Sequence, residues 1–141
     1  MIKKYVYGNP FETEAVVMNI EKTEGVMEYG KVCCEKKFSF EYEMSQKDMI
    51  FGLGQSNRGI NKRGYIYISN CTDDPEHTEH KTSLYGAHNF IVVSGEKNFG
   101  LFVDYPSTVI FDIGYTHSDK LKIECEYCDV TLYVIEGQNA Y

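Results

Sequence analysis

The sequence lacks the features that would mark a nucleic-acid or membrane protein. Its 14 basic residues are scattered and outnumbered by 21 acidic ones, giving a net charge of -7. No basic stripe is present to neutralise phosphates, which argues against nucleic-acid partners and anionic membrane surfaces. No apolar run approaches the roughly 20 residues of a membrane span, and no apolar signal segment follows Lys3 and Lys4. We therefore expect a cytoplasmic protein with no nucleic-acid or membrane partner.

Helical periodicity is also missing, and short strand-like runs take its place. Along residues 37–44, Phe38, Phe40, Tyr42 and Met44 alternate with polar side chains, as in a half-buried strand. Similar runs recur about every 8 to 12 residues between glycine-rich or polar turns, which predicts one all-β domain, an antiparallel β-sandwich or barrel. The expected strands cover residues 5–7, 26–29, 31–34, 37–44, 65–68, 90–93, 99–103, 109–113, 121–125 and 130–135.

The cysteines number five and allow three interpretations. Thiolates with His77 or His80 would form a zinc site, and Cys125 with Cys128 would form a redox dithiol. A zinc knuckle usually brackets a turn with glycine or proline, and a redox dithiol usually begins a helix, whereas a strand pattern follows Cys128. We therefore predict small buried side chains in a reducing compartment, with no metal.

Residues 57–86 contain most of the polar side chains that no strand pattern explains. Within them, residues 70–83 form a polar stretch, and an ordered loop of this length is uncommon in a compact β domain unless it is functional. Asp73 and Asp74 are adjacent carboxylates, but neighbouring side chains usually diverge, so they fit the paired acids of a glycosidase poorly. Hydrogen bonding to sugar hydroxyls and an Asx-turn leading into Pro75 remain the two alternatives.

Other catalytic motifs are not supported by the sequence. It has no Gly-x-Ser-x-Gly elbow, and residues 52–57 lack the third glycine and the lysine of phosphate-binding loops. Lys62 and Arg63 would clamp an anion, or more commonly brace a nearby loop through an arginine fork. We predict no catalytic residue and no cofactor in this chain.

A family resemblance emerges from six motifs in register. These motifs are Gly52-Leu53-Gly54, Asn61-Lys62-Arg63-Gly64, Asn70-x-x-Asp73-Asp74-Pro75, Thr82-Ser83-Leu84-Tyr85-Gly86-x-His88-x-Phe90, Phe99-Gly100-Leu101-Phe102-x-Asp104-x-Pro106 and Phe111-Asp112-x-Gly114. Together they resemble the N-terminal domain of glycoside hydrolase family 31, the α-glucosidase family, in its bacterial form. The sequence departs from the family at Gln55, where glutamate is common.

The resemblance implies a galactose-mutarotase-like β-sandwich and a supporting role. Residues 1–141 would be one domain packed against a catalytic (β/α)8 barrel that is absent from this chain. The polar loop would reach over the barrel mouth, where Asp73, or Asp74 as the near alternative, hydrogen-bonds an α-glucoside or maltooligosaccharide. The nucleophile and the acid/base belong to the barrel, so the chain alone is expected to be inactive.

Two alternatives to this role remain open. A free-standing carbohydrate-binding module would use Tyr65, Tyr67 or Tyr85 as stacking platforms beside Asp73. A purely structural interaction β-sandwich would instead present an exposed apolar patch. The barrel-facing surface of an isolated domain would show such a patch too, so self-association through that surface is also expected.

Overall fold

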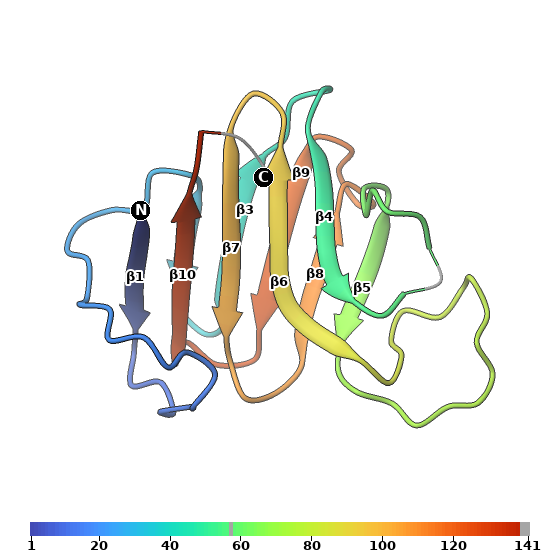
Figure 1. Ribbon diagram of the computed structural model, residues 1–141, viewed down its shortest axis with the longest axis horizontal. Helices are drawn as coiled ribbons and strands as arrows, with labels where there is room; N and C mark the ends of the chain where they lie inside the picture. The colour runs from blue at the N-terminus through green and yellow to red at the C-terminus, as the bar shows by residue number, and fades with distance from the viewer. Residues whose placement is uncertain (57, 139–141) are drawn as a thin grey trace.

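The computed structural model describes residues 1–56 and 58–138 and consists of antiparallel strands (Figure 1). The described residues contain no helix, and therefore none that could cross a membrane. The strands are β1 (Ile2–Tyr7), β2 (Lys31–Cys34), β3 (Phe38–Glu43), β4 (Met49–Gly54), β5 (Tyr65–Ser69), β6 (Ala87–Ser94), β7 (Asn98–Asp104), β8 (Val109–Ile113), β9 (Lys120–Cys125) and β10 (Val130–Glu136).

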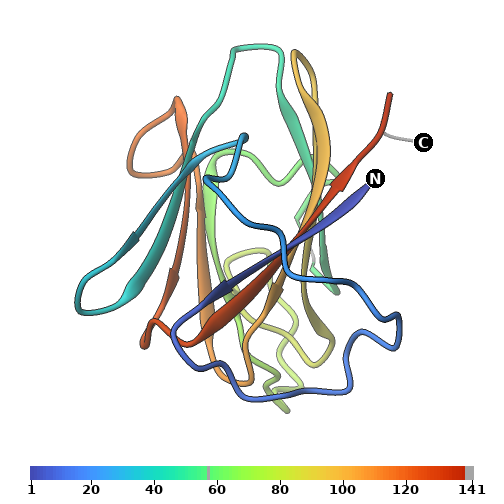
Figure 2. The ribbon, with the colours of Figure 1, turned by 90° about the vertical axis from the view of Figure 1, so that its left-hand side faces the viewer.

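The strands form two five-stranded sheets that pack face to face (Figure 2). The strand order is β1-β10-β7-β6-β4 in one sheet and β2-β3-β9-β8-β5 in the other. Strands β1 and β2 are therefore edges at one end of the sandwich, and β4 and β5 are edges at the opposite end (Figure 1). The prediction of an antiparallel β-sandwich is confirmed.

The core lies between the sheets and follows from the alternation of side chains along each strand. In β3, Phe38, Phe40 and Tyr42 are buried, and the residues between them are half-buried. In the opposite sheet, Leu101 and Val103 of β7 are fully buried. Each such side chain stabilises the fold by about 1.5–3 kcal/mol relative to an exposed one. This continuous core holds the strand ends, and hence the loops between them, in place.

A long segment, residues 8–30, lies first over the outer face of the β1-β10-β7-β6-β4 sheet and then passes the β1 edge to the opening between the sheets, without forming a strand (Figure 2). The prediction of a strand at residues 26–29 is wrong. Val26 is 94% exposed, while Met27 is buried in the core and Tyr29 stacks on Phe99 with ring centroids 4.4 Å apart. Met27 and Tyr29 cover one end of the core as single side chains. Their apolar character therefore did not require a strand.

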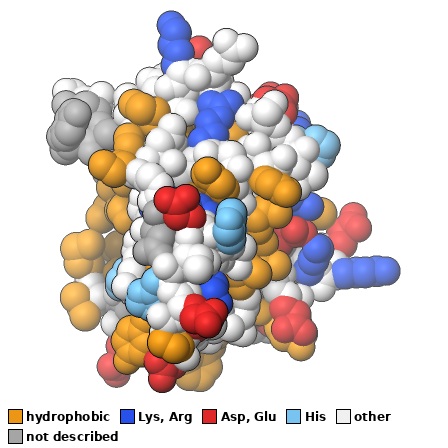
Figure 3. Space-filling view, turned by 90° about the vertical axis from the view of Figure 1, so that its right-hand side faces the viewer, with side chains coloured by type: hydrophobic (Ala, Val, Ile, Leu, Met, Phe, Trp, Pro, Cys, Tyr) orange, Lys and Arg blue, Asp and Glu red, His pale blue; other side chains and the backbone are white. Residues whose placement is uncertain are grey.

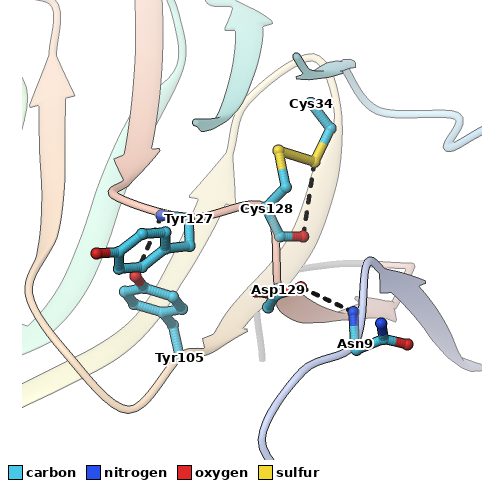
Figure 4. The surroundings of a disulfide bond; sticks show 6 residues. All are labelled: Asn9, Cys34, Tyr105, Tyr127, Cys128 and Asp129. Atoms are coloured by element: carbon cyan, nitrogen blue, oxygen red, sulfur yellow. Dashed lines mark hydrogen bonds between the residues drawn. A yellow bond between two sulfur atoms is a disulfide. The ribbon is translucent and has the colours of Figure 1, made fainter. Parts of the chain in front are cut away.

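A disulfide joins Cys34, at the end of β2, to Cys128 in the turn between β9 and β10 (Figure 4). The Cα atoms of the two residues are 5.5 Å apart. The prediction of uniformly buried, unpaired cysteines is therefore wrong, because Cys33 and Cys71 are also exposed and only Cys125 fits it. Burial raises the pKa of the Cys125 thiol to about 12, so that thiol is inert at neutral pH.

The turn that carries Cys128 has further attachments (Figure 4). The Tyr127 amide donates a 3.3 Å hydrogen bond to the Tyr105 hydroxyl, and the Asn9 amide donates a 2.8 Å hydrogen bond to Asp129 Oδ1. This corner of the sandwich is thus fixed by covalent and polar contacts, far from the β4 and β5 edges.

Candidate functional site

The polar loop predicted from the sequence connects β5 to β6 at the end where β4 and β5 are edge strands (Figure 1). We call residues 70–86 the β5–β6 loop. Strand β5 is an edge strand in which Tyr67 is buried and Tyr65 is 44% exposed. The loop therefore starts from the rim of the sandwich and has room to extend outward.

A β-bulge in β4 sets the base of the loop. The pairing of β4 with β6 shifts register between Gly52 and Gly54, and Leu53 between them has a positive φ of 66°. A Cβ atom at Gly52 would lie 2.2 Å from the Phe90 carbonyl oxygen, so only glycine fits there. The Gly-Leu-Gly motif thus serves to bend β4 where it meets the loop.

Gln55, the position that departs from the family pattern, fastens the end of the loop. Its amide donates a 2.8 Å hydrogen bond to the Gly86 carbonyl oxygen. Its side-chain Oε1 accepts a 3.1 Å hydrogen bond from the Gly86 amide. A glutamate carboxylate would accept the same bond, so the substitution leaves the local fold intact.

The two limbs of the β5–β6 loop are hydrogen-bonded close to the sandwich. The Ile68 amide donates to the Thr82 carbonyl oxygen at 2.9 Å, and the Thr72 amide donates to the Leu84 carbonyl oxygen at 3.2 Å. The Ser83 hydroxyl also donates to the Asn70 carbonyl oxygen. These hydrogen bonds hold the two limbs together at their base, and the exposed middle of the loop lies beyond them.

The two adjacent acids of the loop have different surroundings. Asp74 pairs with Lys81 and accepts a 2.9 Å hydrogen bond from the Glu76 amide. The Lys81 hydrogen bond first, and the Glu76 amide second, lower the pKa of the Asp74 carboxyl below its ordinary value. Asp73 is exposed and makes no hydrogen bond or ion pair with residues 1–56 or 58–138. Asp74 is thus engaged within the loop, whereas the Asp73 carboxylate has no partner among the described residues.

The three tyrosines proposed as sugar-stacking platforms differ in how accessible their rings are. Tyr67 is only 5% exposed, and Tyr65 is covered by the Arg58 guanidinium, whose Cζ lies 4.3 Å from the ring centroid. Tyr85, in the β5–β6 loop, is 68% exposed. Of the three tyrosines, Tyr85 is the one whose ring faces remain open to a ligand.

Lys62 and Arg63 brace the loop between β4 and β5, which was the more common of the two expected roles. Arg63 Nη1 donates to the carbonyl oxygens of Ser45 and Asp48 at 2.6 and 3.1 Å, and Nη2 donates to that of Ser118 at 2.8 Å. Lys62 Nζ donates to the Gly59 carbonyl oxygen at 3.1 Å. Burial and then the nearby Arg58 charge lower the pKa of Lys62. This arrangement holds backbone and presents no free cation pair for an anion.

The histidines of the β5–β6 loop, His77 and His80, are both exposed. Within the described ranges, no three His, Cys, Asp or Glu side chains group closely enough to hold a metal ion. The sequence did not single out Arg58, whose guanidinium contacts both β5 and the loop. Its only sequence signal was an arginine between glycine-rich turns, which does not indicate a partner.

The surface around the loop is mixed in character. Figure 3 looks onto this end of the sandwich and shows hydrophobic side chains interspersed with charged groups and histidines. Exposed apolar side chains from its segments include Ile60, which is 80% exposed, together with Tyr65 and Tyr85.

Comparison with known families gives one clear match. The model of the glycosyl hydrolase 31 N-terminal galactose mutarotase-like domain matches residues 6–112. An α-glucosidase of Saccharolobus solfataricus is 27% identical over 141 residues, covering 96% of this chain and 20% of that protein. The chain therefore spans about a fifth of the length of this relative.

Solved structures share the fold. A glycoside hydrolase family 31 dextranase of Flavobacterium johnsoniae, complexed with glucose, matches with a TM-score of 0.68 and 24% identity, over 80% of this chain and 14% of that chain. A cycloalternan-forming enzyme of Listeria monocytogenes, in complex with a pentasaccharide substrate, matches with a TM-score of 0.65 and 19% identity, over 72% of this chain and 10% of that chain.

Proposed function

Because this chain belongs to the glycosyl hydrolase 31 N-terminal galactose mutarotase-like domain family, we propose that it is the non-catalytic N-terminal domain of an α-glucosidase. In that enzyme it supports the catalytic (β/α)8 barrel and extends the β5–β6 loop to the bound α-glucoside or maltooligosaccharide. The low coverage of the relative, 20% of its length, agrees with one domain of a larger enzyme.

The observation that carries the proposed contact between the loop and the substrate is the contrast between Asp73 and Asp74. The loop carrying both acids is fastened at its base, and Asp74 is engaged within it by Lys81 and the Glu76 amide. Asp73 projects from the same loop, exposed and without a partner among the residues that the structure describes. An ionised carboxylate accepts strong hydrogen bonds from sugar hydroxyls, so Asp73 is the proposed substrate contact.

The barrel contact is assigned to the end of the sandwich from which the loop extends. Ile60, Tyr65 and Tyr85 supply apolar area beside the loop. Burying this area against the barrel would hold the loop over the barrel mouth, because one rigid surface would then position both. The isolated chain would leave the same side chains exposed to water.

Activity measurements on the purified chain test the non-catalytic role. We expect no hydrolysis of p-nitrophenyl α-glucoside, since the proposal places the nucleophile and the acid/base in the catalytic barrel. The full enzyme containing this domain is the positive control. Hydrolysis by the 141-residue chain alone would contradict the proposal.

Paired substitutions in the full enzyme test the role of Asp73. Asp73→Ala should lower kcat/KM by roughly tenfold to a hundredfold, because it removes a charge-assisted hydrogen bond to the sugar. Asp73→Asn, which keeps one acceptor oxygen, should lose less. Unchanged kcat/KM in Asp73→Ala, together with a loss in Asp74→Ala, would transfer the role to Asp74.

Self-association of the isolated chain follows from the same exposed surface. We propose that the chain forms concentration-dependent oligomers through the barrel-facing end and that Ile60→Ser weakens them. Sedimentation velocity over a concentration series measures this. Val26→Ser is the matched control, because Val26 is also highly exposed, at 94%, but lies in residues 8–30, away from this end. Equal weakening by both substitutions would rule out a specific surface.

A free-standing carbohydrate-binding module is the second candidate function. The exposed ring of Tyr85, in the same loop as Asp73, favours it. Titration calorimetry of the chain with maltose and isomaltose separates the two candidates. Saturable binding that Tyr85→Ala abolishes would support the module, whereas the domain role predicts no measurable binding without the barrel.

A further inference from the structure

Arg58 connects the outer limb of the β5–β6 loop to the sandwich through three hydrogen bonds. Its Nε donates to the Glu79 carbonyl oxygen at 3.1 Å, and its Nη2 donates to the His80 carbonyl oxygen at 3.5 Å. From the same guanidinium, Nη1 donates to the Ile66 carbonyl oxygen of β5 at 2.9 Å. One planar group thus holds two consecutive loop carbonyls and one strand carbonyl.

The guanidinium itself is held in place by the tyrosines of β5. Its Cζ lies 4.3 Å from the Tyr65 ring centroid and 5.1 Å from that of Tyr67. Tyr67 is buried, so its ring is a fixed surface. Arginine stacks on aromatic rings and keeps its donors in one plane, which makes it suited to hold several carbonyl oxygens at once.

The contact matters because it reaches the exposed outer part of the loop. Residues 75–80 are all exposed, and the backbone bonds of Ile68 and Thr72 fasten only the base. The Asp74–Lys81 pair is internal to the loop and does not tie it to a strand. Within residues 1–56 and 58–138, the hydrogen bonds from Arg58 join the Glu79 and His80 carbonyl oxygens to β5.

We propose that Arg58 is a positioning residue that holds the outer limb of the β5–β6 loop against β5 and thereby sets the place of Asp73. The link to Asp73 rests on the proposed function, in which that carboxylate contacts sugar. The holding of the loop does not, since it is a property of the chain without ligand or barrel.

Arg63 provides a matched control. It also uses its guanidinium to hold three carbonyl oxygens, those of Ser45, Asp48 and Ser118, and none of these belongs to the β5–β6 loop. Replacing Arg63 removes an arginine fork from the same connection between β4 and β5. General destabilisation caused by losing an arginine fork would therefore appear in both the Arg58 and the Arg63 variants. Loosening of the β5–β6 loop would appear only in the Arg58 variants.

Hydrogen exchange of the 141-residue chain, read at single amides by NMR, tests the proposal. In Arg58→Ala, the amides of Ile68, Thr72 and Lys81, which are bonded to the loop or within it, should exchange about tenfold faster, as expected for loss of a charge-assisted hydrogen bond. In Arg63→Ala, exchange at these three amides should stay as in the wild type. Amides of β7 and β10 report whether the sandwich remains folded.

Arg58→Lys keeps the test decisive if Arg58→Ala fails to fold. Lysine retains the charge but has no planar fork, so the same three amides should again exchange faster. Wild-type exchange at these amides in either Arg58 variant would overturn the proposal. So would equal acceleration in Arg63→Ala.

The enzyme assay separates this inference from the proposed function. If Arg58 variants loosen the loop while Asp73→Ala leaves kcat/KM unchanged, the positioning role stands and the sugar contact fails. If Asp73→Ala impairs turnover while the loop amides of Arg58→Ala exchange as in the wild type, the sugar contact stands and the positioning role is overturned. In the double variant, adding Arg58→Ala to Asp73→Ala should cause no further loss of kcat/KM.

Discussion

Asp48 illustrates how much one buried side chain does in this fold. It is 2% exposed, and Oδ2 accepts 2.9 Å hydrogen bonds from the Tyr42 hydroxyl and from the Ser45 amide. Its Oδ1 accepts 3.0 Å hydrogen bonds from the Ser45 hydroxyl and from the Glu96 amide. Asp48 therefore joins the turn after β3 to the turn between β6 and β7, and hence links the two sheets.

Removing this carboxylate should destabilise the sandwich. In Asp48→Ala, we expect the free energy of unfolding to fall by about 3 kcal/mol, because buried donors lose their acceptor. Urea denaturation followed by circular dichroism measures the change. Asp119→Ala is the control, since Asp119 is exposed and its replacement should cost less than about 0.5 kcal/mol. Similar losses in both variants would contradict this account.

Asp48 should also make stability depend on acid pH. Burial by itself would raise its pKa, but the hydrogen bonds from the Ser45 and Glu96 amides and from Tyr42 outweigh burial and lower the pKa below its ordinary value of 3.8. A lowered folded-state pKa adds stability above the unfolded-state pKa, and this contribution disappears as pH falls through the folded-state value.

We expect the difference in stability between the wild type and Asp48→Asn to become smaller as the pH falls. Denaturation midpoints measured from about pH 6 down to about pH 2 should converge below about pH 4, where the unfolded state begins to take up the proton. A difference in stability that stays constant across this range would show that Asp48 does not titrate with unfolding.

At the scale of an element, β4 shows why a conspicuous motif can be structural. Gly52 and Gly54 flank the bulge and have positive φ values of 117° and 69°. The motif that marked the family therefore bends an edge strand and brings Gln55 to Gly86. The motif therefore affects the candidate site indirectly, because it positions the end of the β5–β6 loop.

Gly52→Ala should consequently cost far more than an ordinary surface substitution. Its Cβ would meet the Phe90 carbonyl oxygen, and its φ is unfavourable for alanine, so we expect a loss of about 3 kcal/mol or more. The control is Gly59→Ala, where a Cβ would have no neighbour within 4 Å. Thermal unfolding of the two variants measures the contrast, and equal Tm values would refute it.

For the whole molecule, the disulfide is a covalent bond between two distant parts of the chain. Cys34 and Cys128 are 94 residues apart in sequence, so the bridge restricts a large part of the unfolded chain. It also anchors β2, an edge strand that pairs only with β3 among the described strands.

We expect Cys34→Ser to lower the free energy of unfolding by about 2–4 kcal/mol, and a reductant to have the same effect on the wild type. Cys33→Ser is the matched control, because Cys33 is exposed and unpaired and lies next to Cys34. The measurement is urea denaturation with and without dithiothreitol. A reductant effect that persists in Cys34→Ser would mean that the bridge is not its source.

The sequence alone predicted the sandwich, the position of the polar loop and most of the strands, but not β4. Alternation along Phe38, Phe40 and Tyr42 is a local property, because successive side chains of a strand point to opposite faces whatever lies elsewhere. The same reasoning failed at residues 26–29, where apolar side chains serve the core singly.

The pairing of distant segments required the folded structure. Arg58 meets Glu79, and Cys34 meets Cys128, only because the order of strands in the sheets brings their turns together. The difference between Asp73 and Asp74 likewise depends on where Lys81 returns along the loop. Side-chain alternation depends only on residues that are neighbours in the sequence. The contacts between distant loops depend instead on how the folded sheets bring those loops together, and no local sequence pattern specifies this.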